Sequence, residues 1–429
     1  MKSIRTIFSK PDNVSGSVLL KERTSSPVYE DHGERMIISF MNEPRPAESN
    51  IDKSFEVMAK SGITVYMPWI YKKEYESICE KYGLTYIPHT EEKMPQEVSR
   101  YLQPNVISDN VTGYYYKDEP TYGGITRYAL AAQNHQTYYP NKYFLVNLLP
   151  DWIKDRGEGG RFGGDYTGYV KHYCDVVFSK IASNRILSVD CYPLNSDGTM
   201  KTEWLTCYET IAEYAKRYNA IFHFYVANTC HWGYRAMDLT SLRFMVNVAM
   251  TYGGNALSYF TYVTYDDYLR QGWGEGIVKN EDGITPTSMY HIVRQMNSEL
   301  LSWDHVFLNF AWEMTMCIKG TNSGSDRLYR ELRFNAKSID IIDAIKASEN
   351  TLVGRFTGKD GEIGLMVTNF SDVKDNLTDN VEINLKEANT AIIYVNGQAS
   401  VRSLRNGELN LSLAAGEAAF VIPIRLTER

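Results

Sequence analysis

The chain has 429 residues, which is too long for one ordinary hydrophobic core, so we expect a large domain with a smaller one. Its content of 43% hydrophobic and 23% charged residues is typical of a globular protein. The net charge of −7 comes without a basic cluster, so this surface would not attract nucleic acid or an anionic membrane, and we exclude nucleic acid as a partner.

No segment reaches the ~18 apolar residues that a membrane-spanning helix needs, so we predict no membrane span. The first residues, MKSIRTIFSKPDN, lack the apolar core of a secretory signal. We therefore expect a cytoplasmic protein by default, or a periplasmic or secreted one if a leader has been removed. The six cysteines show neither a CxxC pair nor metal-ligand spacing, which favours free thiols and no cofactor. Nothing in the sequence indicates the oligomeric state.

Residues 1–33 are polar and irregular and predict an N-terminal arm. Apolar runs rich in aromatic and β-branched residues then alternate with segments whose apolar residues recur every three or four positions. The runs predict strands at 36–41, 63–70, 84–89, 111–116, 143–149, 186–192, 221–227 and 256–263. The segments predict helices at 51–60, 72–81, 96–102, 125–137, 165–173, 204–218, 239–252 and 287–303.

This alternation over roughly 270 residues matches the usual size of a parallel (β/α)8 TIM barrel, which we assign to residues 34–305. An open doubly wound sheet is the alternative, but the chain has no Gly-rich phosphate loop to support it. After Trp303 the helical period gives way to short alternating runs separated by Asp-Gly, Asn-Gly and Ala-Gly turns. We therefore predict an α/β protein whose residues 306–429 form a small antiparallel β-sandwich, an accessory domain.

Reactive groups of such barrels lie at the carboxyl ends of the strands. The stretch VTGYYYKDEP, residues 111–120, is a strand that runs into Asp118, Glu119 and a proline. The two acids could instead be charges at the N-terminus of the following helix. The other predicted strand ends supply polar, acidic and aromatic side chains: Asn42, Trp69, His89, Asn147, Asp190, Tyr192, Asn228, His231, Trp232, Tyr262 and Asp266.

Acids and aromatics without a serine triad, HExxH or calcium-loop motif suit the cleavage of glycosidic bonds. A general acid protonates the leaving oxygen, a second carboxylate stabilises or attacks the oxocarbenium-like centre, and aromatic faces stack on the sugar. His89 and His231 could join Asp190 around a metal. Lone histidines at strand ends more often bond to substrate or backbone, so we predict no metal site.

Three stretches resemble the β-galactosidase-like glycoside hydrolases of clan A: GYYYKDEP at 113–120, DCYP at 190–193, and Arg243 with YGGNALSYFTY at 252–262. The resemblance covers roughly residues 34–303, and the β-rich tail is similar to the sandwich that often follows such barrels. It implies hydrolysis of O-glycosidic bonds. In clan A the acid/base glutamate, usually preceded by Asn, ends strand four; Glu119 matches this position, with Asp118 in place of the Asn.

The departure from the family lies at strand seven, which in clan A carries a nucleophilic glutamate. Here residues 224–232 read FYVANTCHW, and no acid follows before Asp238. We therefore predict Glu119 and Asp190 as the catalytic pair, with Asp118 and Asp266 in reserve. Binding of carbohydrate is assigned to the remaining strand-end side chains: Asp118, Trp69, His89, Asn147, Tyr192, Asn228, Trp232, Tyr262 and Asp266.

A catalytically inactive barrel that binds glycans is the main alternative, and another barrel hydrolase or lyase is a third. Several residues also have purely structural interpretations. Asp190 could cap its loop through Asx-turn bonds, the aromatics could be packing at the rim, and Arg243 could hold an internal ion pair. The glycine-bearing loop at 273–276 is where a mobile lid would sit.

Overall fold

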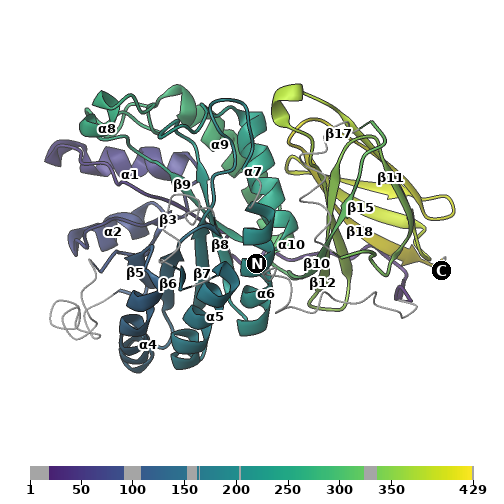
Figure 1. Ribbon diagram of the computed structural model, residues 1–429, viewed down its shortest axis with the longest axis horizontal. Helices are drawn as coiled ribbons and strands as arrows, with labels where there is room; N and C mark the ends of the chain where they lie inside the picture. Colours follow the sequence, from purple (N-terminus) through teal and green to yellow (C-terminus); the bar gives the residue numbers. More distant parts are fainter. Residues whose placement is uncertain are drawn as a thin grey trace. The chain divides into compact units, whose positions relative to one another are not determined.

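The computed structural model describes residues 19–90, 108–151, 162–163, 165–201, 204–322 and 336–427. The chain forms two compact units (Figure 1). The parallel unit comprises Ile37–Met237 and Gly254–Asn297. The antiparallel unit comprises Met1–Met36, Asp238–Gly253 and Ser298–Arg429.

A curled sheet of six parallel strands is the centre of the parallel unit. Its strands lie in the order β2 (Ile37–Phe40), β9 (Ala256–Phe260), β8 (Ile221–Ala227), β7 (Arg185–Asp190), β6 (Tyr143–Leu148) and β5 (Gly113–Asp118). Strand β8 is buried along nearly its whole length, as expected where both faces of a parallel sheet are covered.

Two further strands, β3 (Val65–Tyr66) and β4 (Thr85–Tyr86), pair in parallel with each other. An isolated bridge between Tyr86 and Val111 links β4 to the chain before β5, and the Thr64 amide donates to the Ile38 carbonyl at 2.9 Å beside β2. A strand therefore lies at each of the eight predicted places. In the described part of the chain the ladder is continuous through six of them and does not close into a barrel.

Helices follow most strands and flank the sheet (Figure 1). In the parallel unit they are α1 (Ile51–Lys60), α2 (Glu74–Lys81), α4 (Ile125–Tyr138), α5 (Tyr166–Val176), α6 (Trp204–Tyr218) and the short α8 (Asp266–Arg270). The start of α5 is set by Asp165, whose side chain accepts from the Gly168 amide as an N-cap. The helix predicted at 96–102 lies outside the described residues. Helix α9 (Ser288–Leu301) runs from the parallel unit into the antiparallel one.

The antiparallel unit contains two sheets. One has the order β10 (Phe310–Ile318), β12 (Thr351–Gly358), β13 (Ile363–Asn369), β18 (Ala418–Leu426), β15 (Thr390–Val395) and β16 (Gln398–Ser403), with β1 (Glu22–Arg23) parallel to β18. The other has the order β11 (Ile342–Ala347), β14 (Asp379–Leu385) and β17 (Glu408–Leu413). Residues from both sheets, such as Leu365 and Val381, share one apolar cluster, which gives a sandwich.

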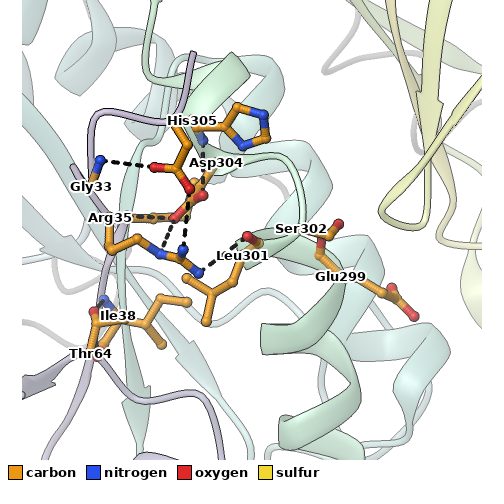
Figure 2. Close-up of polar contacts among 11 residues, drawn as sticks. Gly33, Arg35, Ile38, Thr64, Glu299, Leu301, Ser302, Asp304 and His305 are labelled. Atoms are coloured by element: carbon orange, nitrogen blue, oxygen red, sulfur yellow. Dashed lines mark hydrogen bonds and ion pairs between the residues drawn. The ribbon is translucent and has the colours of Figure 1, made fainter. Parts of the chain in front are cut away.

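The antiparallel unit also includes α7 (Leu239–Thr251), α10 (Asp304–Phe307) and the segment before β2. Asp304 holds that segment, because its carboxylate accepts from the Met36 amide at 3.0 Å and pairs with the Arg35 guanidinium at 3.3 Å. Figure 2 shows Arg35 beside Asp304. Arg35 also donates to the Leu301 carbonyl at the end of α9. Arg243 on α7 pairs with Glu299, with its Nε 2.9 Å from the carboxylate, which confirms the internal ion pair.

Candidate active site

A cavity of about 380 Å³ opens in the parallel unit where the sheet strands end. Three acids, three other polar side chains and a wall of aromatic rings surround it. The lining residues are Met41, Asn42, Trp69, Asp118, Glu119, Asn147, Pro150, Asp190, Tyr192, Tyr225, His231, Trp232, Tyr234, Phe260, Tyr268 and Trp273. A concave site with aromatic walls and a few converging polar groups is the usual form of a small-molecule or substrate site.

The acids come from the carboxyl ends of neighbouring strands. Asp118 ends β5, Glu119 follows it, and Asp190 ends β7, while Asn147 stands on β6 between them. The Asn147 amide nitrogen donates to Oδ1 of Asp118 at 3.0 Å and to Oδ1 of Asp190 at 2.9 Å. Because both oxygens bond to one nitrogen, their separation cannot exceed the sum of these distances, about 5.9 Å.

Burial favours the protonated form of both aspartates, and at Asp190 repulsion by the neighbouring acids adds to it. Burial raises the pKa of Asp190 well above its usual range, and the charges of Glu119 and Asp118 raise it further. Burial also raises the pKa of Asp118, although hydrogen bonds from Asn147 and from Tyr115, at 2.8 Å, favour its ionised form. A close pair of acids titrates as a coupled unit, so a proton is retained in the site at a pH where isolated aspartates are ionised.

Three cavity residues have a left-handed backbone that residues other than glycine rarely adopt. The φ angles are 61° at Asn42, 47° at Glu119 and 43° at Trp232. Such conformations cost of order 1–3 kcal/mol each and cluster at functional sites. At Glu119 the strained turn directly follows β5, and its amide donates to the Asn147 carbonyl at 2.9 Å, so the backbone there is fixed.

Aromatic rings form the rim. The side chain of Trp232 is 66% exposed and meets Trp273 edge-on, with ring centroids 4.8 Å apart. Trp273 in turn stacks on Tyr268 at 4.3 Å. An exposed tryptophan held beside two other rings offers a flat apolar face for a sugar ring.

Seven of the eleven predicted site residues line the cavity: Asp118, Glu119, Asp190, Trp69, Asn147, Tyr192 and Trp232. The other four do not. His89 is buried between Trp69 and Tyr115, with ring centroids 4.2 and 3.9 Å away. Asn228 is buried and donates to the Thr261 carbonyl.

The last two predicted residues also lie away from the cavity lining. Tyr262 is fully buried, with its ring 4.5 Å from that of Phe40. Asp266 is exposed at the first turn of α8 and accepts from Asn280. Substrate contact by these two residues, and by His89 and Asn228, stays a prediction.

Several lining residues were not predicted, namely Met41, Pro150, Tyr225, Tyr234, Phe260 and Tyr268. Tyr225 and Phe260 belong to predicted strands, where only the end positions were considered. Tyr234 and Tyr268 come from the segments after β8 and β9, where sequence spacing does not show which side chains return to the site. The bias toward tyrosine in this chain was the available signal.

The loop at 273–276 is bonded to its surroundings. The Gly274 amide donates to the Cys230 carbonyl at 3.0 Å, and hydroxyls of Thr264 and Thr229 donate to the carbonyls of Gly274 and Glu275. These bonds argue against a mobile lid at this loop.

Histidines near the cavity are neutral. Burial lowers the pKa of His89 to about 3 and that of His231 to about 4, and His231 donates through Nδ1 to the Thr229 carbonyl. Within the described ranges, no group of three or more His, Cys, Asp and Glu side chains is placed to hold a metal ion. Likewise, none of the described helices combines the length and apolar character that a membrane span requires.

No protein-family model and no curated protein matches the sequence. Among solved structures, the chain is similar to glycoside hydrolases. An α-L-arabinofuranosidase from Thermotoga maritima shows 11% identity and a TM-score of 0.45 over 90% of this chain and 96% of that one. An Anoxybacillus α-amylase shows 10% identity and a TM-score of 0.45 over 91% and 98%. A β-L-arabinopyranosidase from Geobacillus stearothermophilus shows 12% identity and a TM-score of 0.41 over 91% and 96%.

Proposed function

We propose that the protein is a glycoside hydrolase that cleaves O-glycosidic bonds of oligo- or polysaccharides. The observation that carries the proposal is the pair of aspartates, Asp118 and Asp190, held on one asparagine amide inside an aromatic-walled cavity. In this proposal the eight parallel strands form a (β/α)8 barrel of the β-galactosidase-like clan A type over residues 34–305. Residues 306–429 are its accessory β-sandwich, and residues 1–33 are an arm.

The distance between the aspartates supports a retaining mechanism. Retaining glycosidases place their two carboxyl groups about 5–5.5 Å apart, whereas inverting enzymes need about 6.5–9.5 Å to admit a water. The upper bound of about 5.9 Å between the Asp118 and Asp190 oxygens fits the first class. The carboxylate that attacks the anomeric carbon would then form a covalent glycosyl-enzyme intermediate, which water hydrolyses.

Roles follow from the electrostatics. Asp190, whose pKa is raised most clearly, holds the proton and acts as general acid on the leaving oxygen. Asp118 is ionised first, because Tyr115 donates to it in addition to the Asn147 amide that both aspartates share, and acts as nucleophile. Glu119 is a third acid whose charge keeps Asp190 protonated. The assignment predicted from the sequence, with Glu119 as general acid, is the competing one.

The test is release of reducing ends from a library of plant, host and microbial glycans. Wild type is compared with Asp118→Asn, Asp190→Asn and Glu119→Gln, and with Asp267→Asn as a control acid on exposed α8. Loss of a nucleophile or general acid costs ~10²–10⁴ in rate, so the two cavity aspartates should fall by that factor and the control should not. A large loss in Glu119→Gln with activity kept in Asp118→Asn would favour the competing assignment.

Azide rescue separates the roles further. In Asp118→Gly, azide should restore bond cleavage and give a glycosyl azide of inverted configuration, because azide takes the place of the missing nucleophile. A barrel that only binds glycans remains the second candidate, because β8 ends without an acid. Wild-type protein that binds library glycans by calorimetry but releases no reducing ends would establish that candidate instead.

A further inference from the structure

A row of buried polar side chains crosses the six-stranded sheet, and each strand contributes one residue. The members follow the strand order: Ser39 on β2, Ser258 on β9, His223 on β8, Ser188 on β7, Asn147 on β6 and Asp118 on β5. All members except Asp118 are at most 2% exposed. Only Asn147 and Asp118 line the cavity, so the other members cannot have been placed there to touch substrate.

At the end of the row that meets the two aspartates, the hydrogen bonds fix the orientation of the Asn147 side-chain amide. The Asn147 nitrogen donates to Asp118 and to Asp190, whose carboxyl oxygens accept. Rotating this amide by 180° would place its oxygen against those two oxygens. The Asn147 oxygen therefore points the other way, where the Ser188 hydroxyl donates to it at 2.8 Å.

The next bonds then have only one possible direction. Ser188 has one proton, and it goes to Asn147, so the 2.7 Å contact with His223 must be a bond from Nδ1–H to the serine oxygen. Burial lowers the pKa of His223 to about 3, so the ring is neutral and its Nε2 accepts from Ser258 at 2.8 Å. Ser39, which bonds to Ser258, is left as the first donor. Every donor thus points toward the carboxyls.

We propose that Ser188 and His223 are positioning residues, which lock the Asn147 amide with both N–H groups facing Asp118 and Asp190. This inference rests on the proposed function for its catalytic meaning. An apolar interior would have filled the sheet without the cost of burying five polar side chains. A fully bonded row of uniform direction also polarises each member, which strengthens the last bonds to the carboxyls.

The lock has a specific consequence for protonation. Donation by Asn147 lowers the pKa of both aspartates against the effect of burial. When one carboxyl is protonated, an Asn147 amide that is no longer held by Ser188 can rotate by 180°. Its oxygen then accepts a hydrogen bond from the carboxyl O–H, which favours the protonated form of that carboxyl. Other groups act on the pair as well, namely Lys117, Glu119, Tyr115, Tyr192 and Tyr225. A change at Ser188 leaves all of these in place.

The first experiment titrates the aspartate carboxyl carbons by NMR in wild type, Ser188→Ala and Ser54→Ala. Ser54 is the matched control, a fully buried serine of the same unit whose hydroxyl donates to the Gly283 carbonyl away from the cavity. We expect the apparent pKa values of the Asp118 and Asp190 pair to rise by at least 0.5 in Ser188→Ala, a threefold shift in protonation. Ser54→Ala should leave them unchanged, and Ser188→Thr, which restores a hydroxyl, should return them toward wild type.

A second measurement needs no variant. The ¹⁵N shifts of His223 in the wild-type protein should show a protonated Nδ1 and an unprotonated Nε2 at pH 7. The opposite tautomer would overturn the row's direction and the inference with it, even if Ser188→Ala does not fold.

Kinetics separate this inference from the proposed function. The acid-to-base transition in the pH profile of kcat/KM should shift in Ser188→Ala by the same amount as the NMR pKa values, with KM little changed. A wild type that cleaves glycans, with Ser188→Ala behaving like Ser54→Ala, would overturn the inference alone. Carboxyl shifts in Ser188→Ala without glycan cleavage by wild type would support the lock and overturn the proposed hydrolase.

Discussion

The two units bury very different interiors. The antiparallel unit closes its two sheets over an apolar cluster that includes Leu365, Val381 and Val421. The parallel unit instead places serines, a histidine and an asparagine on the interior of its sheet, next to acids whose pKa values are raised. Replacing a bonded polar pair in an interior by apolar groups of the same shape can be neutral or stabilising, so such a pair adds little stability of its own. One interior is therefore organised for stability, and the other gives up stability to hold a site.

The substitution Asp190→Asn tests most directly whether the parallel unit gives up stability to hold a site. Activity should fall by ~10²–10⁴, because the proton donor is gone. The free energy of unfolding should stay unchanged or rise at pH 8, because an amide replaces an acid whose ionised form is disfavoured by burial. Chemical denaturation beside the glycan assay measures both. A variant that loses stability and activity together would show that Asp190 is structural.

Leu365→Ala tests the antiparallel unit, where we expect a loss of stability. Leu365 is fully buried among other core residues, so its truncation should lower the free energy of unfolding by ~2–5 kcal/mol. The same substitution at Leu377, whose side chain is 40% exposed, should cost less than ~1 kcal/mol. Urea denaturation of both variants provides the measurement. Equal losses would mean that the sandwich interior is not the source of that unit's stability.

Sequence patterns located the strands well where apolar runs are long. The predicted helix at 204–218 and α6 have the same bounds, since its apolar spacing is regular over four turns. Strands β3 and β4 are shorter than predicted because Pro68 and Pro88 lack the N–H that a ladder requires. In the sandwich, alternation of apolar and polar residues could not indicate a strand such as β16, because all its residues are exposed and the segment QASVRS has no apolar face.

The site was predictable to the extent that strand ends converge. That rule placed Asp118, Glu119 and Asp190 in one cavity. It could not find the row through Ser188 and His223, because mid-strand polar residues look like defects in an apolar run until the partner on the next strand is known. Tertiary pairing, which spacing along the chain does not encode, decides these contacts.

The pH dependence of stability sharpens the comparison, because the buried histidines of the described residues, His89, His135, His223 and His231, all lie in the parallel unit. For His135, burial lowers the pKa to about 4 from the ordinary 6.5. The unfolded chain then binds a proton that the folded one does not, so this stability is present above pH ~6.5 and is lost as the pH falls toward 4.

His135→Gln isolates that contribution. At pH 7 it should destabilise the protein, since Tyr116 and the Lys142 carbonyl lose their ring partner. The gap from wild type should narrow by about 2 kcal/mol between pH 6 and 4.5, at ~1.4 kcal/mol per pH unit. Hydrogen exchange of peptides from α4 at each pH measures this difference in the free energy of unfolding. The gap for Leu365→Ala, which involves no titrating group, should not change with pH; parallel behaviour of the two would contradict the assignment.

The smallest expected effect is at the rim. Trp232→Ala removes a side chain that is 66% exposed, so stability should change by less than ~0.5 kcal/mol. Loss of a stacking face should weaken glycan binding by ~0.5–1.5 kcal/mol, a rise of roughly two- to twelvefold in Kd. Trp232→Phe keeps an aromatic ring, so its Kd for glycan should lie between those of wild type and Trp232→Ala. Because the strained φ of 43° remains in both variants, the backbone turn cannot cause a difference from wild type, and a loss of binding in Trp232→Phe as large as in Trp232→Ala would mean that the contact needs the indole itself and not just any aromatic ring.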